Sequence, residues 1–424
     1  MVTGGKGVYI DDMQGNHLLD AFAGLYCVNV GYGRQHVIDA LCEQAQKLSY
    51  YHAYVGHSTE ASIMLSQMIL ERAPANMSKV YFGLSGSDAN ETIIKLTWYY
   101  NNILGRPEKK KIISRWRGYH GSGLMTGSLT GLELFHKKFD LPMEQVIHTE
   151  APYYYHRKDD SMSEEAFSAY CASELEKLIL AQGADTIAAF IGEPALGTGG
   201  LVPPPKGYWQ AIQAVLKKYD ILLIADEVVT GFGRLGSMFG SMHYDIEPDF
   251  ITIAKGLTSA YVPLSGSIVS DKVWNVLERG TDEIGPIGHG WTYSAHPIAA
   301  AAGIASLEVV DELDLVSNAA EVGAYLKQSL HNAIGDHPNV GEIRGEGLLL
   351  AVEFIDDKAS RRFYEPAGAI GPQIATELLK NEVIGRAMPQ GDILGLAPPL
   401  CLNHAEADII VDATSKAVNA VLAK

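Results

Sequence analysis

Short apolar runs alternate with longer helical stretches along most of the chain. Five runs of aliphatic and β-branched residues predict strands at 79–82, 111–114, 187–191, 221–225 and 250–253. Because helical stretches separate these runs, the pattern predicts a mostly parallel sheet covered by helices. After about residue 296, an alanine-rich helix over 297–310, another helix and an α+β stretch from Asn339 predict a second, smaller domain.

Polar residues follow three of the predicted strands. Glu193, Asp226 and Lys255 stand at or just after strand ends, roughly 30 residues apart, which is the length of one βαβ unit. Ligands of open α/β sheets bind at this carboxyl edge, and an amine there can form a Schiff base. Most lysines are solvated surface charges, so the interpretation of Lys255 depends on its companions.

Composition and charge narrow the class of protein. The chain has 424 residues, 47% hydrophobic and 20% charged, which is enough for two domains with large cores. A net charge of -17 repels phosphate backbones and anionic lipid, so we expect no nucleic-acid or membrane partner. The four cysteines are scattered without a CxxC pair, which indicates reduced thiols and no metal site. With no apolar run long enough for a membrane span and no apolar signal core, we expect a cytoplasmic enzyme with small-molecule substrates.

The segment 82–91 predicts a strand, a glycine turn and a helix with an acidic first turn. Such a turn directs backbone N–H groups at an anion; Gly86 permits close approach and Ser87 adds a hydroxyl, so it could hold one phosphate. The alternative is a plain helix cap by Ser87 or Asp88. The segment matches neither GxxxxGK[ST] nor GxGxxG, so a nucleoside triphosphate or a dinucleotide is not indicated.

Asp226 ends a strand that is apolar on its upstream side. A buried carboxylate needs a cation, and a protonated pyridine nitrogen would serve, although Asp226 could instead cap the next helix. Two further segments, 117–121 and 290–297, carry aromatic and hydroxyl groups close to predicted strand ends.

Six motifs in one order carry a resemblance: Ser-Gly-Ser-Asp-Ala-Asn, Gly-Tyr-His-Gly, Gly-Glu-Pro, Asp-Glu-Val, Ala-Lys-Gly and Thr-Tyr-Ser-Ala-His-Pro. Together they resemble the class III, pyridoxal-phosphate-dependent aminotransferases over almost the whole chain. The resemblance implies the fold type I architecture: a large α/β domain with a mainly parallel seven-stranded sheet, and a smaller α+β domain built from both chain ends. We therefore assign residues 49–296 to the large, cofactor-binding domain and residues 1–48 and 297–424 to the small domain. It also implies a homodimer with active sites at the subunit interface, a tetramer being left open.

The resemblance assigns roles residue by residue. Lys255 would form the Schiff base with pyridoxal 5'-phosphate, and Asp226 would pair with its pyridine nitrogen. The remaining cofactor contacts would be Ser85, Gly86 and Ser87 at the phosphate, Tyr119 and Val228 on the two ring faces, His120 beside them, and Thr292 at the phosphate of the neighbouring subunit's cofactor. Glu193 would lie near the cofactor or would only shape the turn before Pro194.

Two departures from the family bear on the substrate. The ornithine, acetylornithine and 4-aminobutyrate enzymes have a glutamate where Thr198 stands and a glutamine where Val229 stands. Both changes resemble the pyruvate-dependent omega-aminotransferases. Those relatives use a mobile arginine, and the sequence around Arg386 resembles the sequence around that arginine. Arg386 would bind a carboxylate and swing aside for a carboxylate-free amine. The alternative is a surface arginine in a loop over 381–390.

Tyr26 and Tyr54 occupy stretches that line the substrate pocket in these relatives, and core tyrosines are the alternative for Tyr54. The leading hypothesis is an amine or omega-amino acid:pyruvate aminotransferase that works by a ping-pong mechanism through pyridoxamine phosphate. An aminomutase or a decarboxylase of the same fold, and a non-catalytic cofactor-binding protein, are the rival hypotheses. The family usually carries an arm ahead of the strand predicted at 4–10, whereas this sequence begins almost at that strand, so the sequence makes no prediction about access to the pocket.

Overall fold

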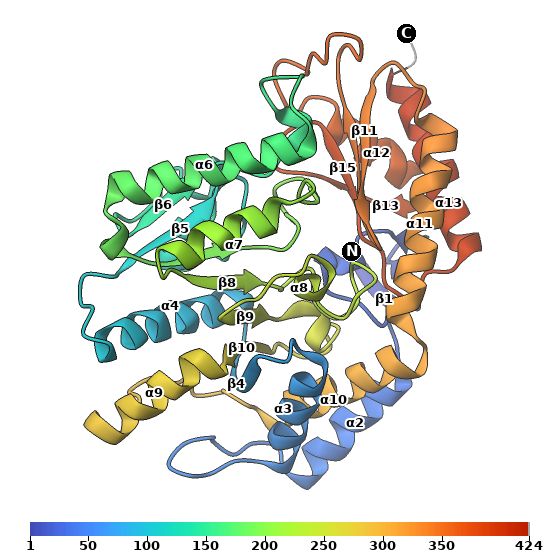
Figure 1. Cartoon of the computed structure of the whole chain (residues 1–424). Coiled ribbons are helices and arrows are strands. Elements are labelled where there is room, and N and C mark those ends of the chain that lie inside the picture. The colour runs from blue at the N-terminus through green and yellow to red at the C-terminus, as the bar shows by residue number, and fades with distance from the viewer. Residues whose placement is uncertain (423–424) are drawn as a thin grey trace.

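The computed structural model describes residues 1–422, and a seven-stranded sheet forms its centre (Figure 1). The strands are ordered β4 (Met77–Gly83), β10 (Ser265–Ser270), β9 (Phe250–Ile253), β8 (Leu222–Asp226), β7 (Ile187–Gly192), β5 (Lys111–Arg115) and β6 (Val146–Thr149). β10 runs antiparallel to both neighbours, and the other adjacent pairs are parallel. The expected mainly parallel, seven-stranded sheet is therefore confirmed.

Two of these strands, β6 and β10, lie where the hydrophobic pattern predicted none. Serines interrupt the apolar run of β10, although the whole strand is buried. The Ser265 hydroxyl donates to Asp88 Oδ1 (2.9 Å) and the Ser267 hydroxyl donates to the Ala89 carbonyl (3.0 Å). Because tertiary hydrogen bonds satisfy these polar groups, β10 can be buried without an apolar pattern.

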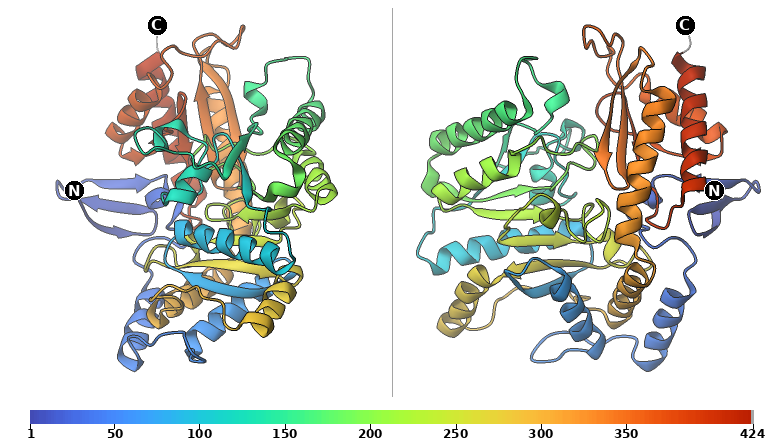
Figure 2. Two further views of the ribbon diagram at one scale, coloured as in Figure 1. Left: turned by 90° about the vertical axis from the view of Figure 1, so that its left-hand side faces the viewer. Right: turned by 45° about the vertical axis from the view of Figure 1, so that its right-hand side comes forward.

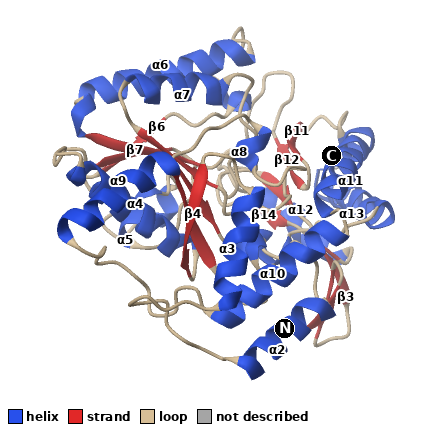
Figure 3. Cartoon of the chain, turned by 60° about the horizontal axis from the view of Figure 1, so that its bottom comes forward, coloured by secondary structure: helices blue, strands red, loops and turns tan. Residues whose placement is uncertain are grey.

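Helices cover both faces of the sheet (Figure 3). One face carries α4 (Gly86–Ile103), α5 (Leu124–Leu129) and α9 (Asp271–Ile284); the other carries α6 (Glu164–Gln182), α7 (Tyr208–Lys218), α3 (Glu60–Arg72) and α10 (Pro297–Glu312). Successive residues of β8 divide between the faces, since Leu222 and Ile224 pack with α4 while Leu223 packs with α7. Burial on both sides explains the continuous apolar runs of the central strands.

The two ends of the chain meet in a smaller α+β part (Figure 2). Strands β1 (Val2–Lys6), β2 (Tyr9–Asp12) and β3 (His17–Asp20) form a sheet with β13 (Val383–Ile384), which pairs parallel with β3. A second sheet contains β11 (Val340–Glu346), β12 (Leu349–Phe354), β15 (Ile393–Leu396) and β14 (Arg386–Ala387), all antiparallel. Helices α11 (Leu315–Ile334), α12 (Gly371–Lys380) and α13 (His404–Leu422) share one hydrophobic core with Leu19 and Val30 from the N-terminal end.

The remaining elements are short or peripheral. They are α1 (Ala23–Tyr26), α2 (Gln35–Lys47), α8 (Gly240–His243) and 3-10 turns at Glu133–Phe135, Tyr154–His156, Ala184–Thr186 and Lys255–Leu257. α2 packs along α10. Within residues 1–422, no helix combines the length and the apolar character that crossing a membrane requires.

The sheet directs several loops to one edge. Strands β4, β5, β7, β8 and β9 run in the same direction, so the segments that follow Gly83, Arg115, Gly192, Asp226 and Ile253 emerge side by side. This is the edge at which open α/β sheets bind ligands.

Candidate active site

A cavity of about 380 Å³ lies at this carboxyl edge, between the loops of the large sheet and strand β14. Its lining contains eleven of the fourteen residues that the sequence singled out: Tyr26, Gly86, Ser87, Tyr119, His120, Glu193, Thr198, Asp226, Val228, Lys255 and Arg386. Leu25, Asn90, Gly121, Phe135, Val229 and Ala254 complete it. Residues distant in sequence therefore converge on one space because the parallel strands end together.

Lys255 follows β9 and begins a 3-10 turn with a left-handed backbone (φ 43°). Its Nζ lies 5.5 Å from the centroid of the Tyr26 ring, and within residues 1–422 it has no hydrogen-bond or ion-pair partner. Burial lowers the pKa of Lys255, and Cys27, Asp226 and Glu193 oppose this effect only in part. The cavity therefore favours a neutral amine, which is the nucleophilic form.

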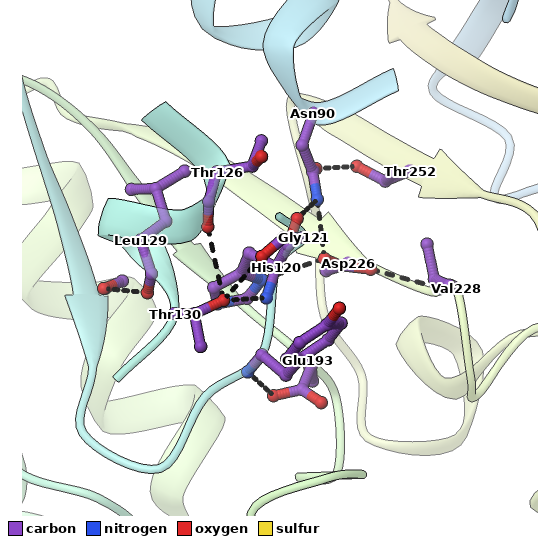
Figure 4. A network of polar contacts seen from close by, with 12 residues as sticks. Asn90, His120, Gly121, Thr126, Leu129, Thr130, Glu193, Asp226, Val228 and Thr252 are labelled. Atoms are coloured by element: carbon purple, nitrogen blue, oxygen red, sulfur yellow. Dashed lines mark hydrogen bonds and ion pairs between the residues drawn. The ribbon is translucent and has the colours of Figure 1, made fainter. Parts of the chain in front are cut away.

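Asp226, at the end of β8, is the centre of a buried hydrogen-bond network (Figure 4). Asn90 Nδ2 donates to Asp226 Oδ2 (2.8 Å), and His120 Nδ1 lies 2.8 Å from the same oxygen. The hydroxyl of Thr252 donates to Asn90 Oδ1 (2.6 Å), and the backbone N–H of Val228 donates to Asp226 Oδ1 (3.2 Å). The carboxylate is thus held in one orientation, with His120 as its only ion-pair partner among residues 1–422.

Asn90 is a candidate site residue that the sequence reasoning missed. It is 1% exposed, and its amide also donates to the His120 carbonyl (2.9 Å), so it links α4, the 117–121 segment and β8. The signal available in the sequence was its place at the end of the Ser-Gly-Ser-Asp-Ala-Asn motif already noted. Its burial became visible only in the structure, where an amide without partners would be costly.

The phosphate-binding candidate lies at the start of α4. Ser85 is the helix N-cap: its hydroxyl accepts the Asp88 N–H (3.2 Å), and the Asp88 carboxylate accepts the Ser85 N–H (3.0 Å). The cap is therefore Ser85, whereas the sequence suggested Ser87 or Asp88, and Ser85 is not among the cavity-lining residues. Gly86 and Ser87 line the cavity at the positive end of this 18-residue helix, where the first backbone N–H groups have no partner within the helix.

Gly86 is needed for close packing there, because a Cβ at this position would approach the Val228 Cγ2 atom to 3.0 Å. The Ser87 hydroxyl accepts the backbone N–H of Ser122 (3.1 Å), which ties the helix start to the loop after Tyr119. The arrangement fits an anion at the cavity floor.

Tyr119 and Val228 both line the cavity, as flat walls for a ring would require. Tyr119 packs edge-on against Phe135 (centroids 5.3 Å apart), and its hydroxyl lies 3.1 Å from Ser122 Oγ. Its backbone N–H donates to Glu193 Oε2 (3.1 Å), while Glu193 Oε1 accepts the Gly197 N–H (2.9 Å). Glu193 thus lines the cavity and also organises the turn, and burial raises its pKa.

Arg386, Thr198 and Tyr26 form the other end of the cavity. Arg386 lies on β14, not in the open loop that was the alternative, and its guanidinium carbon is 5.7 Å from the Phe22 ring centroid. No carboxylate among residues 1–422 pairs with it. Tyr26 is 1% exposed, its hydroxyl lies 3.9 Å from Met388 Sδ, and burial raises its pKa. The Tyr26 phenol is therefore neutral, and Arg386 is left to meet an anion.

Tyr54 and Thr292 lie outside this cavity. Tyr54 sits beside Gly290, where a Cβ would come within 2.1 Å of its hydroxyl, and it lines a separate hollow with Phe82 and Ala295. The Thr292 carbonyl accepts the Tyr50 hydroxyl (2.6 Å). Both residues are exposed on the single chain. The expected place of Tyr54 in the substrate pocket and the expected contact of Thr292 with the neighbouring subunit's cofactor stay predictions.

The residues present fit pyridoxal phosphate. The start of α4 offers unpaired N–H groups for a phosphate, Asp226 offers an oriented carboxylate, and Lys255 offers an unpaired amine in the same cavity. When bound, this cofactor supplies an aldehyde carbon and an electron-withdrawing ring.

The seven-stranded sheet, the smaller part from both chain ends and the lysine at the sheet edge define a fold type I transferase. More narrowly, the chain belongs to the class III aminotransferases, since the family model for aminotransferase class-III matches residues 1–418. It is a transaminase. The expected family is therefore confirmed.

Three relatives illustrate the likeness. A diaminobutyrate–2-oxoglutarate transaminase of Halomonas elongata is 61% identical over 99% of this chain and 90% of its own length. A solved structure described as a transaminase with L-alanine is 45% identical, with a TM-score of 0.97 over 100% of this chain and 99% of its own. The omega transaminase from Pseudomonas jessenii in complex with PMP is 42% identical, with a TM-score of 0.97 over 99% of this chain and 92% of its own.

Proposed function

We propose that this transaminase uses pyridoxal phosphate to move an amino group from an amine or omega-amino acid to a 2-oxo acid, pyruvate, by a ping-pong mechanism. One observation carries the proposal: Arg386 lies in the same cavity as Lys255, and no carboxylate among residues 1–422 pairs with it. Such a guanidinium binds the carboxylate of an oxo acid through two hydrogen bonds.

Lys255 and Asp226 would then have different roles in the reaction. Lys255 Nζ would hold the aldehyde carbon of the cofactor, and as a free amine it would take and return the proton at the substrate carbon. The lowered pKa of Lys255 suits this role because a neutral amine accepts a proton. Asp226, oriented by Asn90 and His120, would stabilise positive charge at the ring nitrogen.

Pyruvate is favoured by the residues around Arg386. Thr198 lines the cavity at the position where the ornithine, acetylornithine and 4-aminobutyrate enzymes carry a glutamate, and Val229 adds an apolar wall. Arg386 would consequently be available to a small 2-oxo acid and would swing aside for a carboxylate-free amine. The relatives solved with L-alanine and as an omega transaminase support this assignment.

A second acceptor deserves a direct comparison, because the relative that is 61% identical is named for diaminobutyrate and 2-oxoglutarate. In that case Arg386 would bind one of the two carboxylates of 2-oxoglutarate. The amine donor would then be a diamino acid.

The deciding experiment is a matrix of donors and acceptors with the holoenzyme. The donors are 1-phenylethylamine, 4-aminobutyrate and 2,4-diaminobutyrate; the acceptors are pyruvate and 2-oxoglutarate. We expect kcat/KM for pyruvate to exceed that for 2-oxoglutarate by about tenfold or more, as one unmatched carboxylate in the pocket would produce. The reverse preference would establish the 2-oxoglutarate alternative. Product analysis without any oxo acid tests the aminomutase and decarboxylase hypotheses.

The Arg386→Ala variant tests the carboxylate site itself. We expect kcat/KM for pyruvate to fall about 100-fold, since a charged two-pronged contact is lost, while the value for 1-phenylethylamine changes by less than about threefold. The oxo-acid and amine half-reactions, each followed by absorbance, measure the two effects separately. Arg362→Ala, which removes an exposed arginine paired with Asp356, is the control and should change neither value. Equal losses for both substrates would rule out the switching role.

We also infer a cytoplasmic homodimer, with a tetramer left open. Exposed Tyr54 and Thr292 would complete the partner subunit's site, and the exposed apolar residues Leu124, Leu134 and Phe139 suit an interface. The four cysteines are free, as in a reducing compartment.

A further inference from the structure

A buried polar cluster lies outside the cavity, between the large sheet and the smaller α+β part. Tyr153, which is 3% exposed, stacks with two guanidinium groups: the carbon of Arg117 lies 4.7 Å from its ring centroid and that of Arg344 lies 4.9 Å away. The Tyr153 hydroxyl donates to Glu353, which also pairs with His156 (2.6 Å) and with Arg344. We call these five residues the Tyr153 cluster.

Arg344 carries the ion pairs of the cluster. Besides Glu353, this β11 residue also donates to Glu342 Oε2 (2.8 Å). Burial alone would raise the pKa of Glu353, but Arg344 and His156 lower it to about 2. The buried Arg344–Glu353 pair favours one geometry, because a shift of either partner leaves a buried charge unpaired.

The two arginines of the cluster donate hydrogen bonds to backbone carbonyls in two segments that line the cavity. Arg344 Nη2 donates to the Gly200 carbonyl (2.7 Å) and Arg117 Nε donates to the Gly199 carbonyl (2.8 Å), both just after Thr198. Arg117 Nη2 also donates to the carbonyl of Gln390 (3.0 Å), in the turn that follows β14 and Arg386.

The contact with the Thr198 loop is close. A Cβ on Gly199 would lie 2.0 Å from the Arg117 carbonyl oxygen, so the two backbones touch without room for a side chain. By contrast, the Lys255 end of the cavity is held by Asn90, His120 and Thr252, which make no hydrogen bond to the cluster among residues 1–422. The two ends of the cavity share the segment 117–121, but different side chains hold them.

We propose that Arg117 and Arg344 are positioning residues for the carboxylate end of the cavity: through the Gly199, Gly200 and Gln390 carbonyls they set the placement of Thr198 relative to Arg386, and so the affinity for the 2-oxo acid. The inference rests on the proposed function, because it assumes that Arg386 receives the acceptor carboxylate. It adds a specificity-determining group that touches neither substrate nor cofactor.

The test uses the holoenzyme with Arg117→Lys, which keeps the charge but cannot bridge the Gly199 and Gln390 carbonyls together. We expect KM for pyruvate to rise about tenfold with kcat little changed, and the half-reaction with 1-phenylethylamine to change less than about twofold. Calorimetry should show a similar loss of affinity for propionate, a carboxylate that does not react.

Two further variants serve as a substitute and as a control in this test. Tyr153→Phe replaces Arg117→Lys in the test if the latter proves too unstable to purify. It removes only the hydroxyl that contacts Glu353 and should raise KM for pyruvate about threefold. The matched control is Arg361→Lys, since Arg361 also lies over a tyrosine (Tyr155, 5.9 Å) and donates to a carbonyl (Arg157, 2.8 Å) but contacts neither cavity segment. It should leave KM unchanged.

A double-mutant cycle with Arg386→Ala distinguishes a failure of the positioning role from a failure of the proposed function. If the cluster acts through Arg386, Arg117→Lys should add less than about twofold to the pyruvate effect of Arg386→Ala. Additive effects, or equal losses in the amine and oxo-acid half-reactions, would overturn the positioning role. If Arg386→Ala alone leaves pyruvate unaffected, the proposed function itself is wrong.

Discussion

Individual residues of the site are defined by their environment more than by their type. Lys255 is one of many lysines, yet among the lysines of residues 1–422 it alone lines the cavity, and burial lowers its pKa. Asp226 is one of many carboxylates, yet a buried amide and a buried imidazole hold its oxygen at 2.8 Å each. Function at this scale follows from which neighbours remove water and which donate hydrogen bonds.

Lys255→Ala should abolish transamination and the visible absorbance of the lysine-bound cofactor, because no other cavity-lining residue supplies an amine. The control is Lys416→Ala, an exposed lysine on α13 that pairs with Asp412 and should retain wild-type spectra and rates. Full activity in Lys255→Ala would remove Lys255 from the mechanism.

Asn90→Ala should weaken cofactor binding and lower kcat by about tenfold, since Asp226 loses an orienting donor and the Thr252 hydroxyl loses its acceptor. Equilibrium dialysis of the cofactor and single-turnover rates measure this. Asn101→Ala is the matched control on the same helix: this buried asparagine donates only to Thr97, so its loss should affect stability but not the cofactor.

At the scale of elements, the loops and strands around the cavity come from both parts of the fold. β5, β7, β8 and β9 bring the cofactor groups together, whereas β14 brings Arg386 from the C-terminal part. The Tyr153 cluster joins the two parts. Tyr153 precedes the 3-10 turn Tyr154–His156, which contains His156, while Arg344 lies on β11 and Glu353 on β12.

The low pKa of Glu353 gives this junction a defined pH dependence. Its folded pKa of about 2 lies below the ordinary value of 4.5, so the pairing contributes stability above about pH 4.5, and that contribution is lost as pH falls towards 2. The difference corresponds to about 3 kcal/mol. Glu353→Gln should therefore destabilise the fold most near neutral pH and progressively less below about pH 4.5, as measured by denaturant unfolding across pH.

Glu283→Gln provides the comparison, because Glu283 is an exposed carboxylate paired with Arg279 on α9 and should give no measurable pH-dependent difference. A Glu353→Gln difference that stays constant from neutral to acid pH would contradict the linkage.

At the scale of the whole molecule, the site is divided between what one chain completes and what it leaves exposed. The single chain brings eleven expected residues into one cavity, but it leaves Tyr54 and Thr292 on the surface. The proposed homodimer gives these two residues a function.

Thr292→Val should weaken cofactor binding about tenfold, because a hydrogen bond to a charged phosphate is lost in the dimer. Mixed dimers of Thr292→Val with Lys255→Ala should then recover full cofactor affinity and activity at one site in each dimer, since that site combines Lys255 from one chain with Thr292 from the other. Dialysis of sorted heterodimers measures this. No recovery over the parent variants would argue against shared sites.

Much of the fold could be predicted from the sequence. Buried parallel strands read as continuous apolar runs, so β4, β5, β7, β8 and β9 were found near their true bounds. β10 was not, because its serines are satisfied by partners on α4 that no local pattern shows. Likewise, the six motifs pointed to the family, but the helix cap of α4 fell on Ser85, where the backbone geometry decides between neighbouring candidates.

By itself the sequence determined the class III family, the strand ends and the lysine at the sheet edge, because these depend on local composition and order. Tertiary structure alone decided the network of Asn90 and His120 around Asp226, the placement of Arg386 on β14 with no carboxylate partner among residues 1–422, and the junction at Tyr153. Hydrogen bonds and burial between residues far apart in the chain depend on how the elements pack, and periodicity along the sequence does not encode that packing.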